Sequence, residues 1–268
     1  MQYINLKKEE LNNLKRFFPK TMMFGTESKL YLYKKDDTLK IIKVINEMTD
    51  NKILTINLIN NYSKNINIQE LVLKSDIATI DNKPIGTITN YIEGTILSNI
   101  IYDKNTPLSY KIDLLKKIGC VLDKIKKVRN SGIDFYIGDL HDDNIIVTKN
   151  NDIRILDMDS SKIMNNEAFP SKYLTRFVRR KKYDNYIINP TESTDNYCFN
   201  MMILNALYSK DLSKLKIADF NRHIDFLDSL GIDKNLINNF YSMYNDNNVL
   251  NLYTELDSLK KQNKIYLK

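Results

Sequence analysis

The feature that most constrains this 268-residue chain is the spacing of three side chains that carry oxygen atoms. Asp139, Asn144 and Asp157 follow one another as D-x4-N-x12-D. Between the last two lie β-prone runs at 145–147 and 153–156, separated by Asn- and Asp-rich turn residues. Because an antiparallel hairpin returns the chain to its starting point, we expect the three side chains to converge.

Two of these residues suit a metal ion. Carboxylate and amide oxygens are ligands for Mg²⁺, which keeps water and substrate phosphate at its other positions. Asn144 and Asp157 are therefore the candidate metal ligands, and Asp139 is left to orient a hydroxyl nucleophile. The alternative interpretation is an ordinary solvated turn, since such spacings arise by chance in an Asn- and Asp-rich chain.

The same stretch resembles a known family. The sequence Ile-Gly-Asp-Leu-His-Asp-Asp-Asn from Ile137 to Asn144, followed by Asp157-Met-Asp159, is similar to the catalytic loop and metal-binding segment of the protein-kinase-like superfamily. The resemblance is to protein kinases of bacterial or viral type, and Gly-Asp-Leu-His is similar to aminoglycoside and choline kinases. Ile137 and Gly138 replace the family's His and Arg, and Asp159 replaces its glycine.

The resemblance implies an α+β, bilobal protein-kinase-like fold, with a small antiparallel β N-lobe that carries one helix and a larger α-helical C-lobe. The corresponding division is an N-terminal helix at 1–20, an N-lobe at 21–93 and a C-lobe at 94–268. Apolar periodicity predicts helices at 6–18, 50–63, 109–131 and from 193 onward, and strands at 21–24, 29–33, 39–45, 71–73 and 85–88.

Lys43 lies on one of these strands and resembles the lysine that contacts the α- and β-phosphates of ATP. The alternative is an exposed lysine on a half-solvated strand. A buried ammonium needs an anionic partner, yet the helix at 50–63 lacks the glutamate that the family places there. Glu47, Glu70 and Asp157 are the open choices. The missing glutamate is the best sign of altered or lost activity.

The resemblance also implies a nucleotide site. Gly25 begins a turn at the place of the family's glycine-rich phosphate loop, although a plain hairpin turn is the alternative. Residues 89–94 resemble the hinge between the lobes. By this resemblance the backbone of Asn90 and Ile92 binds the purine, with Thr89 at the back of the pocket.

Two later segments complete the resemblance. Residues 193–204 are similar to a helix whose aspartate, here Asp195, binds the backbone amides of the catalytic loop in kinases. The alternative is that Asp195 only favours the positive end of its helix. The segment before it binds substrate in the family, and its basic run at 176–182 is either a docking site for an acidic substrate or a solvated charge run.

Composition bounds the compartment and the partners. The net charge of +7 favours anionic partners such as a nucleotide, but lysine is used throughout, and we expect no nucleic-acid binding. Only Cys120 and Cys198 occur, which favours a reducing compartment. No apolar run reaches the ~18 residues of a membrane span, and no signal-peptide pattern is present. We expect a cytoplasmic protein without membrane contact.

Three functions are consistent with these patterns. The first is a protein Ser/Thr kinase that uses ATP and Mg²⁺: Asp139 orients the acceptor hydroxyl, Asn144 and Asp157 hold Mg²⁺, and Lys43 positions the phosphates. The second is a small-molecule phosphotransferase, favoured by the Gly-Asp-Leu-His sequence. The third is a nucleotide-binding pseudokinase scaffold, favoured by the missing helix glutamate but opposed by the retention of Asp139.

Overall fold

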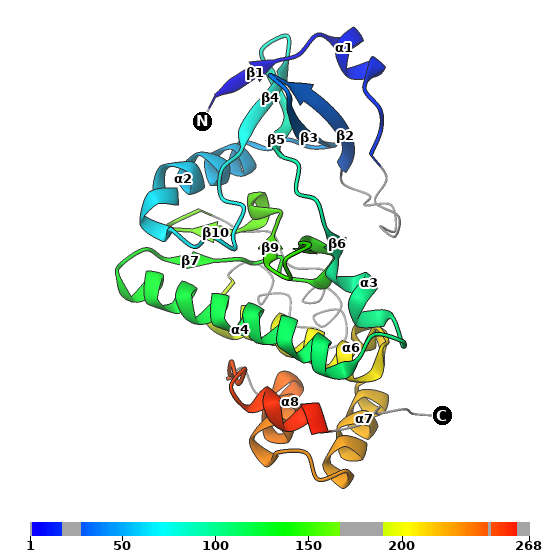
Figure 1. The fold of residues 1–268 in the computed structure, drawn as a ribbon. Coiled ribbons are helices and arrows are strands. Elements are labelled where there is room, and N and C mark those ends of the chain that lie inside the picture. The colour runs from blue at the N-terminus through cyan, green and yellow to red at the C-terminus, as the bar shows by residue number, and fades with distance from the viewer. Residues whose placement is uncertain (1, 18–27, 167–189, 246–247, 262–268) are drawn as a thin grey trace.

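The protein is a mixed α+β structure with a β-sheet at one end and helices at the other (Figure 1). The computed structural model describes residues 2–17, 28–166, 190–245 and 248–261. Within these ranges no helix combines the length and the apolar character that crossing a membrane would need.

The sheet has five strands in the order β1-β4-β5-β3-β2. Neighbouring strands are antiparallel except for β1 and β4, which run parallel, so the expectation of a purely antiparallel sheet is wrong for this pair. The parallel pair arises because β1 enters from the N-terminal segment rather than through a hairpin. The strands are β1 (Tyr3–Asn5), β2 (Ser28–Lys35), β3 (Thr38–Ile45), β4 (Asp76–Ile80) and β5 (Lys83–Asn90).

One face of this sheet has its own small hydrophobic cluster. Ile42 from β3, Ala78 from β4 and Ile88 from β5 are buried there together with Ile4. Because side chains alternate along a strand, Lys43 points to the opposite face. On that side lies α2 (Asp50–Ile66), the helix predicted at 50–63 (Figure 1).

The helix predicted at 6–18 is confirmed only over Lys8–Asn13 and is wrong for the described residues on either side. The strand β1 precedes this segment, and the segment itself forms the short helix α1 (Lys8–Asn13) followed by an extended stretch. In that stretch the backbone N–H of Phe17 donates to Leu30 O at 2.8 Å, and the N–H of Leu32 donates to Lys15 O at 3.0 Å. The exposed edge of β2 offers backbone partners that outweigh the weak helical pattern.

The strand predicted at 71–73 is also wrong. Leu71 forms only an isolated parallel bridge to Ile155, supported by a 2.9 Å hydrogen bond from Val72 N to Ile155 O. The strand that joins the large sheet is β4, a few residues later. Leu71 and Leu73 are buried against the helical part, so their apolar character reflects packing there.

The helical part is built on the long helix α4, which confirms the helix predicted at 109–131. Its buried residues recur every three or four positions, as expected for a helix with one face in the core. The next helix, α6, is buried on nearly all sides, and both belong to one large hydrophobic cluster. The helices are α3 (Leu97–Tyr102), α4 (Leu108–Asn130), α6 (Glu192–Tyr208), α7 (Ile217–Ser229) and α8 (Lys234–Asn245), with 3₁₀ turns η4 (Leu212–Lys214) and η5 (Glu255–Lys261).

Two small sheets lie between the large sheet and α4 (Figure 1). The predicted hairpin is present: β8 and β9 pair in antiparallel register, and β6 joins β8 on its other side. A second pair consists of β7 and β10. The elements are β6 (Thr95–Ile96), β7 (Phe135–Tyr136), η1 (Asp142–Asn144), β8 (Ile145–Val147), β9 (Ile153–Ile155), η2 (Met158–Ser160) and β10 (Lys162–Ile163).

Candidate functional site

The loop that carries Asp139 is held from behind by a buried carboxylate on α6. Asp195 Oδ2 accepts a hydrogen bond from the backbone N–H of Ile137 at 3.0 Å, and its Oδ1 accepts one from that of Gly138 at 3.1 Å. Gly138 has a φ of +76°, a left-handed conformation that favours glycine. Asp195 therefore makes the backbone contacts expected of it from the sequence.

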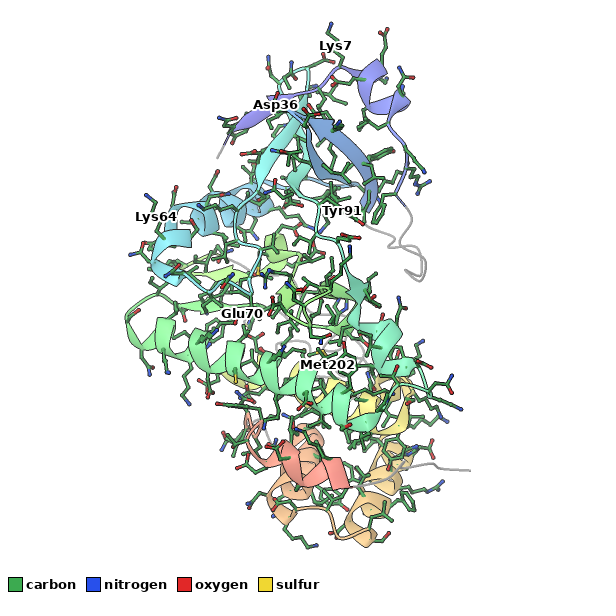
Figure 2. The ribbon with its side chains drawn as sticks, viewed as in Figure 1. Lys7, Asp36, Lys64, Glu70, Tyr91 and Met202 are labelled. Carbon is green, nitrogen blue, oxygen red and sulfur yellow. The ribbon has the colours of Figure 1, made fainter. Side chains whose placement is uncertain are left out.

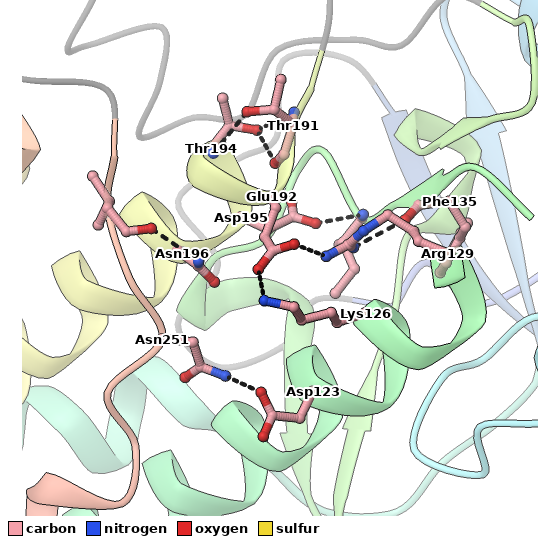
Figure 3. Close-up of polar contacts among 12 residues, drawn as sticks. Asp123, Lys126, Arg129, Phe135, Thr191, Glu192, Thr194, Asp195, Asn196 and Asn251 are labelled. Atoms are coloured by element: carbon pink, nitrogen blue, oxygen red, sulfur yellow. Dashed lines mark hydrogen bonds and ion pairs between the residues drawn. The ribbon is translucent and has the colours of Figure 1, made fainter. Parts of the chain in front are cut away.

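Further polar contacts brace the same loop (Figure 3). Glu192 on α6 contacts Lys126 at 2.9 Å and Arg129 at 2.8 Å, both on α4, and Arg129 also donates to Phe135 O on β7. Burial raises the pKa of Asp195 to about 6, although its two backbone hydrogen bonds oppose this shift. Asp195 is thus a carboxylate acceptor at neutral pH. The end of α4, the start of α6 and β7 form one connected support.

Asp139 is oriented by two neighbours in its own loop. Asn144 Nδ2 donates to the backbone oxygen of Asp139 at 3.1 Å and to its Oδ2 at 3.4 Å. His141 Nδ1 accepts a hydrogen bond from the backbone N–H of Asp143, so the proton of a neutral ring is on Nε2. That Nε2 lies 3.5 Å from Asp139 Oδ2. A partly exposed carboxylate held in this way is suited to accept a proton from a hydroxyl.

Asp157 lies beside Asn144, as the hairpin predicts. The backbone N–H of Leu156, directly before Asp157, donates to Asn144 O at 2.8 Å. Asp157 has a φ of +68°, a left-handed conformation that costs a non-glycine residue about 1 kcal/mol or more. Strain of this kind persists where surrounding contacts impose it. The left-handed conformation of Asp157 directs the chain from β9 into η2.

Lys43 reaches this hairpin from β3 of the large sheet. Its Nζ contacts Asp157 Oδ1 and lies 3.0 Å and 3.3 Å from the two carboxylate oxygens of Asp159. Burial alone would lower the pKa of Lys43, but the charges of Asp157 and Asp159 outweigh burial and raise it. Burial alone would raise the pKa of Asp157, but Lys43 outweighs it and lowers that pKa. The Lys43–Asp157 pair is therefore ionised at neutral pH.

Of the three carboxylates left open as partners of Lys43, Asp157 is the one that contacts it. Glu47 is exposed in the connection between β3 and α2. Glu70, labelled in Figure 2, follows α2 and pairs with Lys124 on α4.

The sequence interpretation missed the second partner, Asp159, and the lysine behind it. The Asp159 side chain is only 5% exposed, and Lys52 Nζ on α2 lies 3.9 Å from its Oδ2. Burial and the neighbouring charge of Asp157 raise the pKa of Asp159 to about 6, which leaves it ionised at neutral pH. Two features of the sequence could have indicated this contact: an aspartate at the family's glycine position and a lysine in the first turn of α2.

Gly86 is a further residue that the sequence interpretation passed over. A Cβ placed on Gly86 would lie 1.8 Å from Lys43 O, because β5 approaches β3 closely at this point. A lone glycine inside a strand often marks such an approach. Gly86 therefore permits the strand position from which Lys43 reaches the hairpin.

The predicted hinge at 89–94 begins in the last two residues of β5 and connects the large sheet to β6 and α3. Asn90 is opposite Lys40 on β3, and the N–H of Tyr91, labelled in Figure 2, donates to Leu39 O at 3.0 Å. Since backbone groups alternate in direction along an extended chain, those of Asn90 and Ile92 point away from β3. They are thus free of the β3 ladder and oriented for another partner.

Three expectations concern residues that the structure does not describe. Gly25, with its expected phosphate contact, lies outside the described residues, as do the strand predicted at 21–24 and the basic run at 176–182.

The donor set fits a hard cation. Asp157 carries carboxylate oxygens and Asn144 an amide oxygen, the ligand types that Mg²⁺ prefers, and the hydrogen bond from Leu156 N to Asn144 O joins their two segments. A second group of possible ligand atoms, on His141, Asp142 and Asp143, lies within 4.8 Å of one another. The Nδ1 lone pair of His141 is already used by the N–H of Asp143, so this group is the weaker candidate.

Comparisons with known proteins add no family assignment. A scan against models of protein families finds no match, and a search of curated proteins finds no significantly similar chain.

Proposed function

We propose that this chain is an ATP-dependent phosphotransferase with a bilobal, protein-kinase-like fold, and that it transfers the γ-phosphate of Mg·ATP to a hydroxyl, foremost of Ser or Thr in a protein. The observation that carries the proposal is the contact between Lys43 of the large sheet and Asp157 of the hairpin, 114 residues later. This contact brings a cation suited to phosphate next to the oxygen ligands suited to Mg²⁺.

The two hydrophobic clusters support a bilobal organisation. The small cluster belongs to the five-stranded sheet, and the large cluster spans α2, the small sheets and the helices. The candidate site lies where these two parts meet, since Lys43 comes from the sheet and Asp157 from the hairpin. A nucleotide between two such parts would contact both.

Each residue has a role under this proposal. Asp139 accepts the proton of the acceptor hydroxyl and orients its oxygen, with Asn144 and His141 fixing the carboxylate. Lys43 binds phosphate oxygens, and the backbone of Asn90 and Ile92 binds the purine. Asn144 and Asp157 would hold Mg²⁺, which when bound offsets the negative charge of the phosphates.

A small-molecule acceptor is the second candidate, and one observation favours it. The Gly138–His141 segment keeps the Gly-Asp-Leu-His sequence similar to aminoglycoside and choline kinases, and the His141 ring faces Asp139 at 3.5 Å. The histidine thus has a definite place beside the proposed base. Both candidates use the same nucleotide chemistry and differ in the acceptor.

The decisive experiment is transfer of labelled γ-phosphate from Mg·ATP. Wild type, Asp139→Ala and the control Asp152→Ala are each tested alone, with generic protein acceptors, and with aminoglycoside and choline acceptors. Asp152 is exposed in the turn of the same hairpin, so it matches the charge change without touching the site. We expect Asp139→Ala to lose about 10²- to 10⁴-fold in rate and Asp152→Ala to retain activity.

The acceptor that becomes labelled decides between the candidates. Label on protein supports the protein kinase, and label on the small acceptor supports the second candidate. If no acceptor is labelled while Mg·ATP still raises the melting temperature, the catalytic proposal is wrong and a nucleotide-binding scaffold replaces it.

A further inference from the structure

Helix α2 begins with a buried lysine where an exposed side chain is expected. Lys52 is the third residue of α2 and is 6% exposed. The N-terminus of a helix carries partial positive charge, and a buried cation there is unfavourable unless an anion lies close. Asp159 supplies a nearby anion, with its Oδ2 at 3.9 Å from Lys52 Nζ.

Asp159 connects two lysines from two different elements. Its Oδ1 lies 3.0 Å from Lys43 Nζ on β3, while its Oδ2 faces Lys52 on α2. Its carboxylate thus lies within ion-pair distance of two buried ammonium groups. Asp159 therefore sets where Lys43 stands relative to α2.

Lys43 also contacts Asp157, but that carboxylate has a second task under the proposed function. A carboxylate that ligates Mg²⁺ shares its charge with the metal and holds a lysine less strongly. Asp159 is a separate carboxylate that stays directed at Lys43. The site thus contains one acidic residue for the metal and one for the lysine.

A second contact attaches α2 to the same chain segment. Asn166 Nδ2 donates to the hydroxyl of Thr55 on α2, and Asn166 Oδ1 accepts the backbone N–H of Ile163. Thr55 and Asn166 are both buried. The first two turns of α2 are therefore fixed to the segment after Asp157 at two points, without any glutamate on the helix.

We propose that Asp159 is the positioning residue for Lys43, and that Lys52 attaches this pair to α2, so that a carboxylate after the strand and a lysine on the helix perform the task of the missing helix glutamate. This inference rests on the proposed function, because the lysine is positioned for phosphate.

A charge exchange between residues 52 and 159 tests the inference. Asp159→Asn removes the carboxylate that Lys43 and Lys52 share, and Lys52→Glu places a second carboxylate against Asp159. In the double variant Lys52→Glu/Asp159→Asn, the new carboxylate on α2 faces Lys43 and a neutral amide replaces its competitor. The readouts are the Kd for ATP by calorimetry with and without Mg²⁺, and kcat and KM for ATP in phosphoryl transfer.

We expect each single variant to raise the KM and the Kd for ATP by about tenfold or more, and the double variant to recover about tenfold relative to either. Glu70→Gln is the matched control, since Glu70 pairs with Lys124 outside the site. It is expected to leave both constants unchanged. A folded state of each variant is verified by its unfolding transition, and if Lys52→Glu does not fold, Lys52→Met takes its place in the cycle.

Lys52→Met removes the charge of the ammonium group. If Lys52 acts through Asp159, this substitution should change the Kd and KM for ATP much less in the Asp159→Asn background than in wild type. Purely additive losses in either cycle would overturn the inference, as would an Asp159→Asn protein that binds ATP and turns over within twofold of wild type. A wild-type protein that neither binds ATP nor transfers phosphate would overturn the proposed function, and the inference with it. A wild-type protein that binds ATP and transfers phosphate, combined with additive losses in the variants, would overturn the inference alone.

Discussion

The ammonium of Lys43 and the carboxylate of Asp157 are in direct contact although 114 residues separate them in the chain. Lys43 is directed by the alternation of β3, and Asp157 by the left-handed turn after β9. The local structure that directs Lys43 is independent of the one that directs Asp157. Their contact is therefore a result of how the sheet and the hairpin pack together. The chemistry of the site depends on this packing.

Replacing Asp157 by asparagine tests the metal assignment. A ligand bound only to the folded state stabilises it by about 2.7 kcal/mol at one hundred times its Kd. We expect wild type to show a larger rise in melting temperature with ATP plus Mg²⁺ than with ATP plus EDTA. In Asp157→Asn this Mg²⁺-dependent part is expected to disappear, because one anionic ligand is lost.

The control for that measurement is Asp152→Asn, at the exposed hairpin turn, which is expected to behave as wild type. A full Mg²⁺-dependent rise in Asp157→Asn would show that the metal binds elsewhere.

The sequence was sufficient where local patterns determine the structure. The hairpin at 145–156 follows from two β-prone runs and a turn, and its closure explains why Asn144 and Asp157 are adjacent. The apolar period of α4 gave that helix to within a residue at each end. The contact of Asp195 with the loop came from a resemblance and is present in the structure.

The sequence was insufficient where distant segments compete. The N-terminal segment has a weak helical pattern, yet residues 15–17 pair with the edge of β2. A pattern read within the segment contains no information about the backbone groups of that edge. Asp159 and Lys52 are 107 residues apart in the chain and come into contact only when α2 packs on η2. A pattern confined to neighbours in the chain cannot reveal either contact.

Gly86 offers a test of how β3 is positioned. In Gly86→Ala the new Cβ would fall 1.8 Å from Lys43 O, so β3 and β5 must separate. Overpacking of this kind costs about 1–3 kcal/mol. We expect a lower free energy of unfolding and also a weaker affinity for ATP by calorimetry, because Lys43 shifts with its strand.

Gly132→Ala is the contrast for this prediction. Gly132 has a φ of +96°, but its new Cβ would meet no atom within 4 Å. This variant is expected to lose stability through backbone strain and to keep its affinity for ATP. Equal ATP affinity in both variants would contradict the role of the β3–β5 approach.

Glu192 gives a prediction for pH. Partial burial alone would raise its pKa, but hydrogen bonds with Lys126 and Arg129 outweigh burial and lower it from 4.5. A carboxyl whose pKa is lower in the folded state adds stability above its unfolded pKa and loses it as the pH falls. Because the side chain is 42% exposed, the contribution is about 0.2–1 kcal/mol.

Glu192→Gln is therefore expected to lower the free energy of unfolding in urea at pH 7. The difference from wild type should shrink as the pH falls below 4.5, where the wild-type carboxyl becomes protonated. Glu47→Gln, at an exposed glutamate, should match wild type throughout. A difference that stays constant with pH would mean that the amide disturbs packing rather than charge.

The two histidines of the chain make a matched pair for the last test. His141 Nε2 faces Asp139 Oδ2 at 3.5 Å, whereas His223 lies on α7, where its Nδ1 is 2.6 Å from Asp219 O. If the His141 ring orients the base, His141→Ala should lower kcat by roughly tenfold or more, as misorientation of reacting groups does, while the KM for ATP stays near wild type. His223→Ala should cost stability without changing kcat. A parallel rise in KM for ATP would instead indicate that His141 shapes the nucleotide site, because a residue that acts only on Asp139 has no contact through which to alter ground-state binding.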